Sequence, residues 1–295
     1  MKDLSSEKDY RPITCLNTFY KIFTGVLGSY MNEHAIRNDI WDKNQMGTCE
    51  GVLGTADQLL IDNCIMSEVR NHKRNLAIAY YNYQKAYDKV HHDWMTIVYR
   101  WMSFPERVVQ VIEQLMCGWK TRPEVIAEGK KGTSRWINIR RGFLQKDSFS
   151  PVGFCLTEVP VSMLIEQSDG YMMGTTGNRN LKRTHSLFID DLKVYQQNHE
   201  KLKMVNETIV KASQDTGACY GVKKCAAIVF NRGRMVNVEG LDVFAERMKA
   251  LDPKQNENYK FLGCQQAEQI DTDAVYERVK AEIDKRMKAL TSTEL

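Results

Sequence analysis

The sequence lacks several features that mark common protein classes. No two of its eight cysteines have the two-residue spacing typical of zinc sites, and they occur singly, as free thiols do in a reducing compartment. No apolar run approaches the ~20 residues that a membrane span needs, no signal peptide opens the chain, and no internal repeat is apparent. We therefore expect an intracellular, soluble protein without a zinc site or a membrane contact.

Charge is nearly balanced along the 295 residues. Lysine and arginine number 41 against 37 acidic residues, a net charge of +4. Basic residues nevertheless cluster at 70–74, 130–131, 140–141, 182–183, 223–224 and 232–234. Such clusters can line a groove for a polyanion, although each alone is more simply a solvated surface cluster. The length allows a large core divided into two or three subdomains.

Hydrophobic periodicity separates helices from strands. It predicts helices over 18–37, 55–71, 92–102, 105–119, 150–167, 200–215 and 271–290. It predicts strands over 76–83, 122–128, 136–140, 225–231 and 259–262, and a hairpin over 185–195. The strands 122–128 and 136–140 are expected to pair across a turn at 129–132. These alternating elements indicate an α+β sheet packed on helices.

The second helix carries two further expectations. Thr55 is a plausible N-cap, because its hydroxyl can accept from the exposed amides of the first turn. Leu59, Leu60, Cys64 and Ile65 are available to face the core.

Two adjacent carboxylates, Asp190 and Asp191, stand inside an apolar, strand-like run. Burying two like charges side by side is costly unless a cation compensates them. Carboxylates on neighbouring strands can hold two divalent ions ~3.5–4 Å apart, the arrangement of nucleotidyl transfer. The pair alone does not decide the matter, since Asp-Asp is also common in surface turns.

Seven motifs in one order strengthen the metal interpretation. They are YRPITCL at 10–16, GTADQLL at 54–60, NYQKAYDKVHH at 82–92, RGFLQKDSFSP at 141–151, FIDD at 188–191, GVKKC at 221–225 and YKFLG at 259–263. Together they resemble the reverse transcriptase domain of a non-LTR (LINE-type) retrotransposon. The resemblance implies an α+β right-hand polymerase fold with fingers at 1–75 and a palm at 76–264 that holds inserted finger elements. Residues 265–295 would be the start of a thumb or a linker.

The resemblance also assigns catalytic roles. Asp190 and Asp191 would bind Mg²⁺ or Mn²⁺ in a two-ion site. Lys224 would donate a proton to the leaving pyrophosphate. Asn82 occupies the position where the family has the third metal-binding aspartate.

Further roles concern RNA template, DNA primer and deoxynucleotides, the partners that the resemblance implies. Arg11 would contact the triphosphate, and Gln145 would lie against the nascent base pair. Tyr87 would be a steric gate that rejects a 2′-hydroxyl. Tyr259 and Gly263 would lie in the turn that grips the primer. Lys130, Arg140 and Arg141 are the candidates for contacts with template phosphates, through electrostatic binding that weakens as the salt concentration rises.

Departures from the family pattern predict impaired catalysis. Asn82 offers a carbonyl oxygen but no negative charge. Unit charges ~4 Å apart interact by about 4 kcal/mol at an effective dielectric of ~20, and a divalent ion roughly doubles this. A third of the doubled value, ~3 kcal/mol, corresponds to roughly a hundredfold loss of rate. Lys146 replaces a family glycine beside the nucleotide pocket, and Met46 and Thr48 replace a usually basic residue and a cysteine in the fingers loop.

Three functional interpretations therefore stay open. The chain is an RNA-directed DNA polymerase domain, active or formerly active; a non-catalytic nucleic-acid-binding scaffold with the same fold; or the remnant of a decayed element. We also expect that the other retroelement parts, a full thumb, a zinc knuckle and an endonuclease, are missing from this chain.

Overall fold

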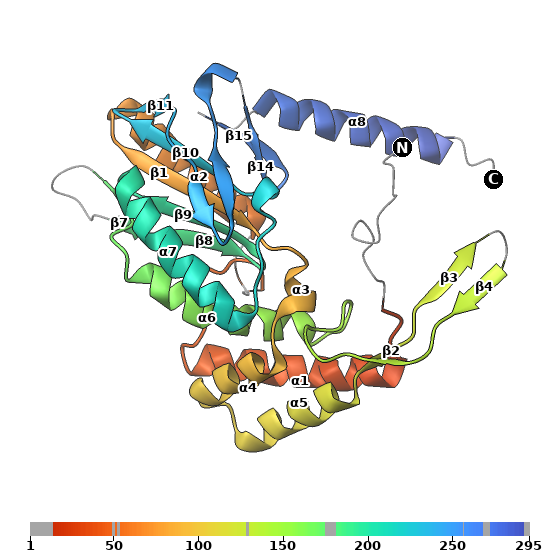
Figure 1. The fold of residues 1–295 in the computed structure, drawn as a ribbon. Helices are drawn as coiled ribbons and strands as arrows, with labels where there is room; N and C mark the ends of the chain where they lie inside the picture. Colours follow the sequence, from red (N-terminus) through yellow and green to blue (C-terminus); the bar gives the residue numbers. More distant parts are fainter. Residues whose placement is uncertain are drawn as a thin grey trace.

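A seven-stranded sheet forms the centre of the described part of the chain (Figure 1). The computed structural model describes residues 14–48, 51, 54–127, 130–174, 181–255, 257–267 and 272–291. The sheet order is β12-β13-β10-β1-β9-β8, with β11 joined to β10. Its strands are β1 (Leu76–Asn82), β8 (His185–Phe188), β9 (Asp191–Gln196), β10 (Ala226–Asn231), β11 (Arg234–Val236), β12 (Leu241–Val243) and β13 (Glu246–Ala250). Neighbouring strands are antiparallel, except that β10 and β13 are parallel. Strand β1 is central, because it pairs with β10 on one edge and with β9 on the other.

Helices pack on both faces of this sheet, and further helices lie beyond one of these faces. They are α1 (Thr18–Arg37), α2 (Thr55–Asn71), α3 (Ala86–Lys89), α4 (His92–Trp101), α5 (Glu106–Gly118), α6 (Ser150–Glu166), α7 (His199–Thr216) and α8 (Thr272–Thr291). The helical predictions are confirmed to within a few residues. Among the described helices, none combines the length and the hydropathy needed to cross a membrane.

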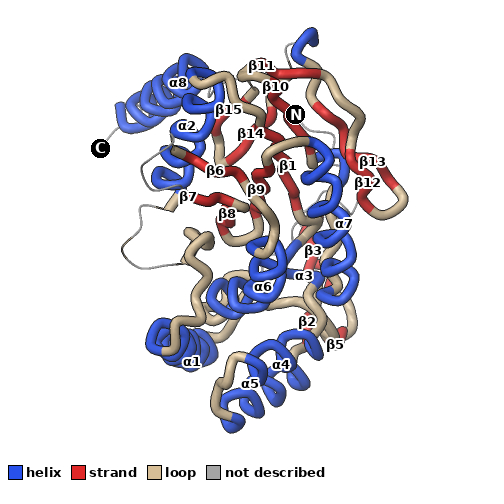
Figure 2. Tube along the Cα trace, turned by 90° about the vertical axis from the view of Figure 1, so that its left-hand side faces the viewer, coloured by secondary structure: helices blue, strands red, loops and turns tan. Residues whose placement is uncertain are grey.

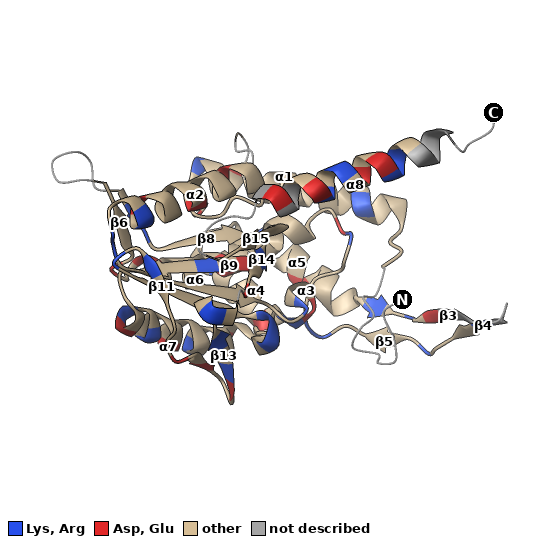
Figure 3. Cartoon of the chain, turned by 90° about the horizontal axis from the view of Figure 1, so that it is seen from above, with Lys and Arg blue, Asp and Glu red and all other residues tan. Residues whose placement is uncertain are grey.

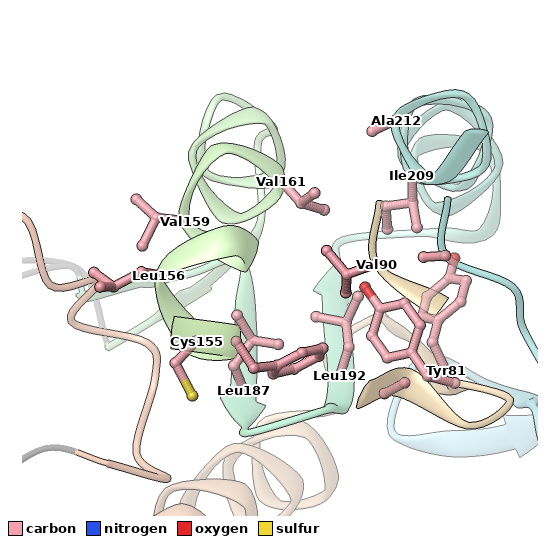
Figure 4. Packing of buried hydrophobic residues seen from close by; sticks show 14 of the residues in the cluster. Tyr81, Val90, Cys155, Leu156, Val159, Val161, Leu187, Leu192, Ile209 and Ala212 are labelled. Atoms are coloured by element: carbon pink, nitrogen blue, oxygen red, sulfur yellow. The ribbon is translucent and has the colours of Figure 1, made fainter. Parts of the chain in front are cut away.

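Side-chain alternation along β1 divides the core into two layers. Ala77, Ala79 and Tyr81 face α6 and α7, and Figure 4 shows Tyr81 with Ile209 of α7 above it. Leu76 and Tyr80 belong to the second cluster, which includes residues of α2. Because both faces are buried, the strand reads as a continuous apolar run, which is why it was recognisable in the sequence.

A second group of helices lies on the far side of α6. Helices α1, α4 and α5 form the lower layer in Figure 2. Thr24 of α1 donates to the buried carboxylate of Asp147, and the Trp119 indole donates to the Tyr20 hydroxyl at 2.8 Å. The first bond attaches α1 to the motif at 141–151, and the second attaches it to the end of α5.

The predicted pairing of 122–128 with 136–140 is wrong. Instead β3 (Glu124–Ala127) pairs with β4 (Lys130–Thr133), and β2 (Lys120–Thr121) pairs with β5 (Ile137–Asn138). Ala127 stands opposite Lys130, so pairing continues into the segment that was expected to be the turn. The glycines and lysines at 129–132 are compatible with a turn, but the pairing register of β3 and β4 determines where the turn lies.

Helix α2 also differs from its prediction. Gly54, with φ of 63°, is the N-cap, and Thr55 is the first helical residue. Leu60 and Cys64 are exposed, whereas Asp62 is buried. Asp62 faces inward because it forms an ion pair with the fully buried Lys193 of β9, and a buried charge requires such a partner.

The remaining strands form small hairpins outside the central sheet. These are β6 (Tyr171–Met173) with β7 (Leu181–Arg183), and β14 (Tyr259–Phe261) with β15 (Cys264–Gln266). Helix α8 follows β15, and Figure 3 shows charges of both signs along it. Arg278 of α8 donates to the carbonyl of Gly263, which joins the helix to the turn of the hairpin.

Candidate active site

The two adjacent carboxylates lie at one end of the central sheet. Phe188 of β8 pairs with Asp191 of β9, which leaves Ile189 and Asp190 as a two-residue turn. Asp190 therefore lies in the tight turn of the predicted hairpin, whereas Asp191 is the first residue of β9. Ladder bonds fix Asp191, whereas Asp190 is held by the geometry of the turn.

Asn82 is the residue directly opposite Asp191. It ends β1, and the two Cα atoms are partners in the antiparallel ladder. Opposite residues project to the same face of a sheet, with Cβ atoms about 4.5–5.5 Å apart. The structure thus brings Asn82, Asp190 and Asp191 together from segments that lie about a hundred residues apart.

Two neighbouring groups fix the backbone of Asn82. Its N–H donates to the Sγ atom of Cys225 at 3.3 Å, and its carbonyl accepts from the N–H of Gly221 at 2.8 Å. Burial raises the pKa of Cys225 to about 11, so this thiol stays protonated. Sequence reasoning missed Cys225, although its position at the start of a buried strand beside the Lys224 motif was a signal.

The electrostatics of the pair favour a cation. Burial, followed by the negative charge of Asp190, raises the pKa of Asp191 to about 6. A divalent ion would offset both costs, so these two carboxylates fit a cation such as Mg²⁺ or Mn²⁺. Within the ranges that the structure describes, however, no three acidic, histidine or cysteine side chains gather as a metal site. The third group here is the uncharged amide of Asn82.

Lys224 and the expected primer-grip residues adjoin this group. Both Asn82 and Lys224 flank Gly221: a Cβ placed there would lie 3.8 Å from Asn82 Oδ1 and 3.9 Å from Lys224 Cδ. The Tyr259 hydroxyl donates to the Lys224 carbonyl at 2.8 Å. Lys224 itself is exposed at the end of a short 3₁₀ helix.

The β14–β15 hairpin ends in a tight turn. Leu262 and Gly263, with φ of 46° and 84°, connect Phe261 to its partner Cys264, the pattern of a type I′ turn. The Tyr259 ring stacks on Tyr80 with 4.2 Å between centroids. This stacking holds the hairpin against the face of β1 that also carries Asn82.

Tyr87 lies on α3, close to the turn that carries Asp190. Its ring stacks on Phe154 with centroids 4.8 Å apart and an interplanar angle of 15°. Burial raises the pKa of Tyr87 well above its usual value, and the charges of Cys155 and Asp190 add to the shift. The phenol therefore stays neutral and its ring is held in one orientation.

Gln145 and Lys146 belong to a loop that packs on α3. Gln145 donates to the Asp88 carboxylate at 3.2 Å, and the N–H of Phe143 donates to the Tyr87 carbonyl at 2.6 Å. Lys146 has φ of 63°, a left-handed conformation that glycine adopts without penalty. The structure thus explains why glycine suits this position.

Other predicted contacts are less defined. Arg11 and the beginning of its motif lie outside the described residues. Arg140 and Arg141 are exposed beside the loop that holds Gln145 and Lys146, and Lys131 pairs with Glu124 at 2.9 Å. Their contact with a template stays a prediction.

Sequence reasoning also missed Glu158. It lies on α6, is buried, and accepts from the Tyr83 hydroxyl at 2.7 Å. Burial raises its pKa to about 7; the hydrogen bond from Tyr83 opposes this shift and the charge of Asp190 adds to it. The available signal was an acidic residue in the middle of an apolar helix.

Comparison with known proteins agrees with this arrangement. Residues 2–266 match the family model described as reverse transcriptase (RNA-dependent DNA polymerase). The retrovirus-related Pol polyprotein from the type-1 retrotransposable element R2 of Nasonia vitripennis is 25% identical over 233 residues, which are 78% of this chain and 21% of that protein. The chain therefore spans about a fifth of the length of this relative. The predicted resemblance to a non-LTR reverse transcriptase domain is confirmed.

One solved structure shows the same fold at low sequence identity. Apo telomerase from Candida tropicalis, truncated from its C-terminal domain, has a TM-score of 0.50 and 13% identity, covering 77% of this chain and 45% of that one. Telomerase from Candida albicans with a fragment of telomeric RNA has a TM-score of 0.49 and 10% identity, covering 76% and 37%. The predicted α+β fingers-and-palm fold is confirmed. The family match extends over nearly the whole chain, which belongs to the reverse transcriptase (RNA-dependent DNA polymerase) family.

Proposed function

We propose that this chain is the polymerase domain of a non-LTR retroelement protein and that its RNA-directed DNA synthesis is severely impaired. One observation carries the proposal: Asn82 faces Asp191 in the sheet, at the position where the family has its third metal-binding carboxylate. The family match and the R2 relative support the reaction class. The impairment rests on the missing charge.

The side chains of this group would divide the work of nucleotide addition. Asp190 and Asp191 would hold a divalent ion, which when bound activates the primer hydroxyl and neutralises charge on the phosphates. Tyr87, with its ring fixed against Phe154, would close the space beneath the sugar and favour deoxynucleotides. The exposed amine of Lys224 would supply a proton to pyrophosphate.

Primer and template would lie along the same end of the sheet. The β14–β15 hairpin, anchored through Tyr259 to Lys224 and Tyr80, would hold the primer strand. The exposed guanidinium groups of Arg140 and Arg141 would contact template phosphates. We retain fingers at 1–75, a palm at 76–264 and a thumb start at 265–295 as proposed boundaries.

A binding protein without catalysis is the second candidate. The backbone of Asn82 is held in place, because Cys225 and Gly221 bond both of its backbone groups. A fold that is intact around an altered ligand is consistent with a protein kept for nucleic-acid binding.

Primer extension separates these proposals. The unmodified chain and its Asn82→Asp variant would be compared on an RNA template with Mg²⁺ or Mn²⁺. We expect activity in the variant and roughly a hundredfold less, or none, in the unmodified chain. Equal activity in both would contradict the impairment. If neither extends a primer, salt-dependent RNA binding by the unmodified chain would support the binding protein.

A further inference from the structure

A loop of the expected fingers region lies along the edge of the catalytic hairpin. The N–H of Met46 donates to the Leu187 carbonyl, and the N–H of Leu187 donates to the Asn44 carbonyl, both at 2.9 Å. Gln45 thereby forms a parallel bridge with Leu187 of β8. Residues 44–46 act as a short additional strand beside the hairpin that ends in Asp190.

The side chain of Gln45 reaches the turn itself. It is 3% exposed, and its Oε1 atom accepts from the N–H of Ile189 at 2.8 Å and of Gly47 at 3.0 Å. Its Nε2 atom donates to the carbonyl of Ile189 at 3.3 Å. One side-chain amide therefore binds both backbone groups of the residue before Asp190.

Ile189 needs such support. Its φ of 57° is left-handed, at the first central position of the turn, where a type II′ turn usually has glycine. A β-branched residue rarely adopts this conformation and keeps it only where the surroundings hold it. Gly47 permits the close approach, because a Cβ there would lie 2.4 Å from Ile189 Cγ1.

We propose that Gln45 is a positioning residue for the metal-binding turn. By holding the Ile189 backbone in its left-handed conformation, its amide sets the direction in which Asp190 presents its carboxylate. This inference rests on the proposed role of Asp190 and Asp191 as ligands of a divalent ion. It links a fingers loop to the metal ligands without any contact between Gln45 and the ion.

The test replaces Gln45 by methionine, which has similar length but no amide. Its matched control is Gln196→Met, since Gln196 is also buried and its amide also accepts from a backbone N–H, that of Gly170, at the other end of β9. Both changes are made in the full chain with and without Asn82→Asp. Mn²⁺ binding is measured by titration, and exchange of the Ile189 amide hydrogen is measured by NMR.

In the Asn82→Asp chain we expect Gln45→Met to weaken Mn²⁺ binding by about ten- to a hundredfold, the range typical of groups that orient metal ligands. Gln196→Met should leave it unchanged, even if both variants lose similar stability. Exchange at Ile189 should accelerate only in Gln45→Met. Adding Ile189→Gly to Gln45→Met should recover Mn²⁺ affinity, because glycine adopts the positive φ unaided.

Equal Mn²⁺ affinity or equal Ile189 exchange in the two glutamine variants would overturn the role of Gln45. In that case Mn²⁺ binding that is lost in Asp190→Asn would still support the proposed function. Absence of Mn²⁺ binding in the Asn82→Asp chain itself would overturn the metal site, and with it this inference.

Discussion

Asn82 and Asp191 are direct partners across the ladder between β1 and β9, at the end of the sheet where Asp190 is the last residue of the adjacent turn. An amide therefore stands opposite a carboxylate whose pKa burial has already raised to about 6. A third carboxylate would require a cation more strongly than the present pair does.

This relationship predicts an ion-dependent effect of Asn82→Asp on stability. In EDTA the variant should lose about 1 kcal/mol of unfolding free energy, because like charges directly opposite repel. Mn²⁺ should reverse the loss, since a ligand that binds only the folded state stabilises it. Urea denaturation with EDTA and with Mn²⁺ measures both effects. Asn231→Asp, at the far end of β10, is the control, and the same Mn²⁺ response there would contradict a site at Asn82.

Glu158 predicts a fall in stability between pH 4.5 and 7. The folded-state pKa of about 7 exceeds the ordinary value of 4.5, so in this window the folded chain keeps a proton that the unfolded chain releases. Stability therefore decreases as pH rises, by roughly 3 kcal/mol at most. Glu158→Gln should remove this decrease. Urea midpoints across the window test it, with the exposed Glu207→Gln as a control that keeps the wild-type profile.

Lys146 predicts a difference between two substitutions at one position. Its φ of 63° costs a residue with a Cβ about 1–2 kcal/mol, while glycine in the unfolded chain has greater entropy that partly cancels the gain. Lys146→Gly should therefore be more stable than Lys146→Ala by about 1 kcal/mol. Thermal denaturation compares the two. An alanine variant as stable as the glycine variant would show that the backbone is not strained here.

Tyr87 predicts the sugar preference of an active variant. In the Asn82→Asp chain, Tyr87→Ala should raise incorporation of ribonucleotides relative to deoxynucleotides, because the ring that stacks on Phe154 is removed. Tyr87→Phe keeps the ring and should keep the preference. Single-nucleotide extension with each type of substrate measures the ratio. An unchanged ratio in Tyr87→Ala would contradict a steric gate.

Much of the fold was predictable because local patterns carry it. The apolar run of β1 and the periodicity of α7 each identify their own element, and the order of the motifs identifies the family. Prediction failed where a distant partner decides. Leu60 of α2 is exposed and Asp62 is buried because Lys193, more than a hundred residues away, needs a counter-ion. The β3–β4 pairing was missed for a different reason: its partner is local, and the register of the two strands, more than the composition of the segment, sets where the turn lies.

The sequence by itself determined the chemistry available at the site: two adjacent carboxylates, an asparagine without charge and a lysine in place of glycine at 146. Only the tertiary structure decided that Asn82 faces Asp191, that Cys225 bonds its backbone, and that Gln45 holds Ile189. Residue identity fixes charge and backbone freedom locally. Which groups meet depends on the packing of segments far apart in the chain, and no local pattern encodes that packing.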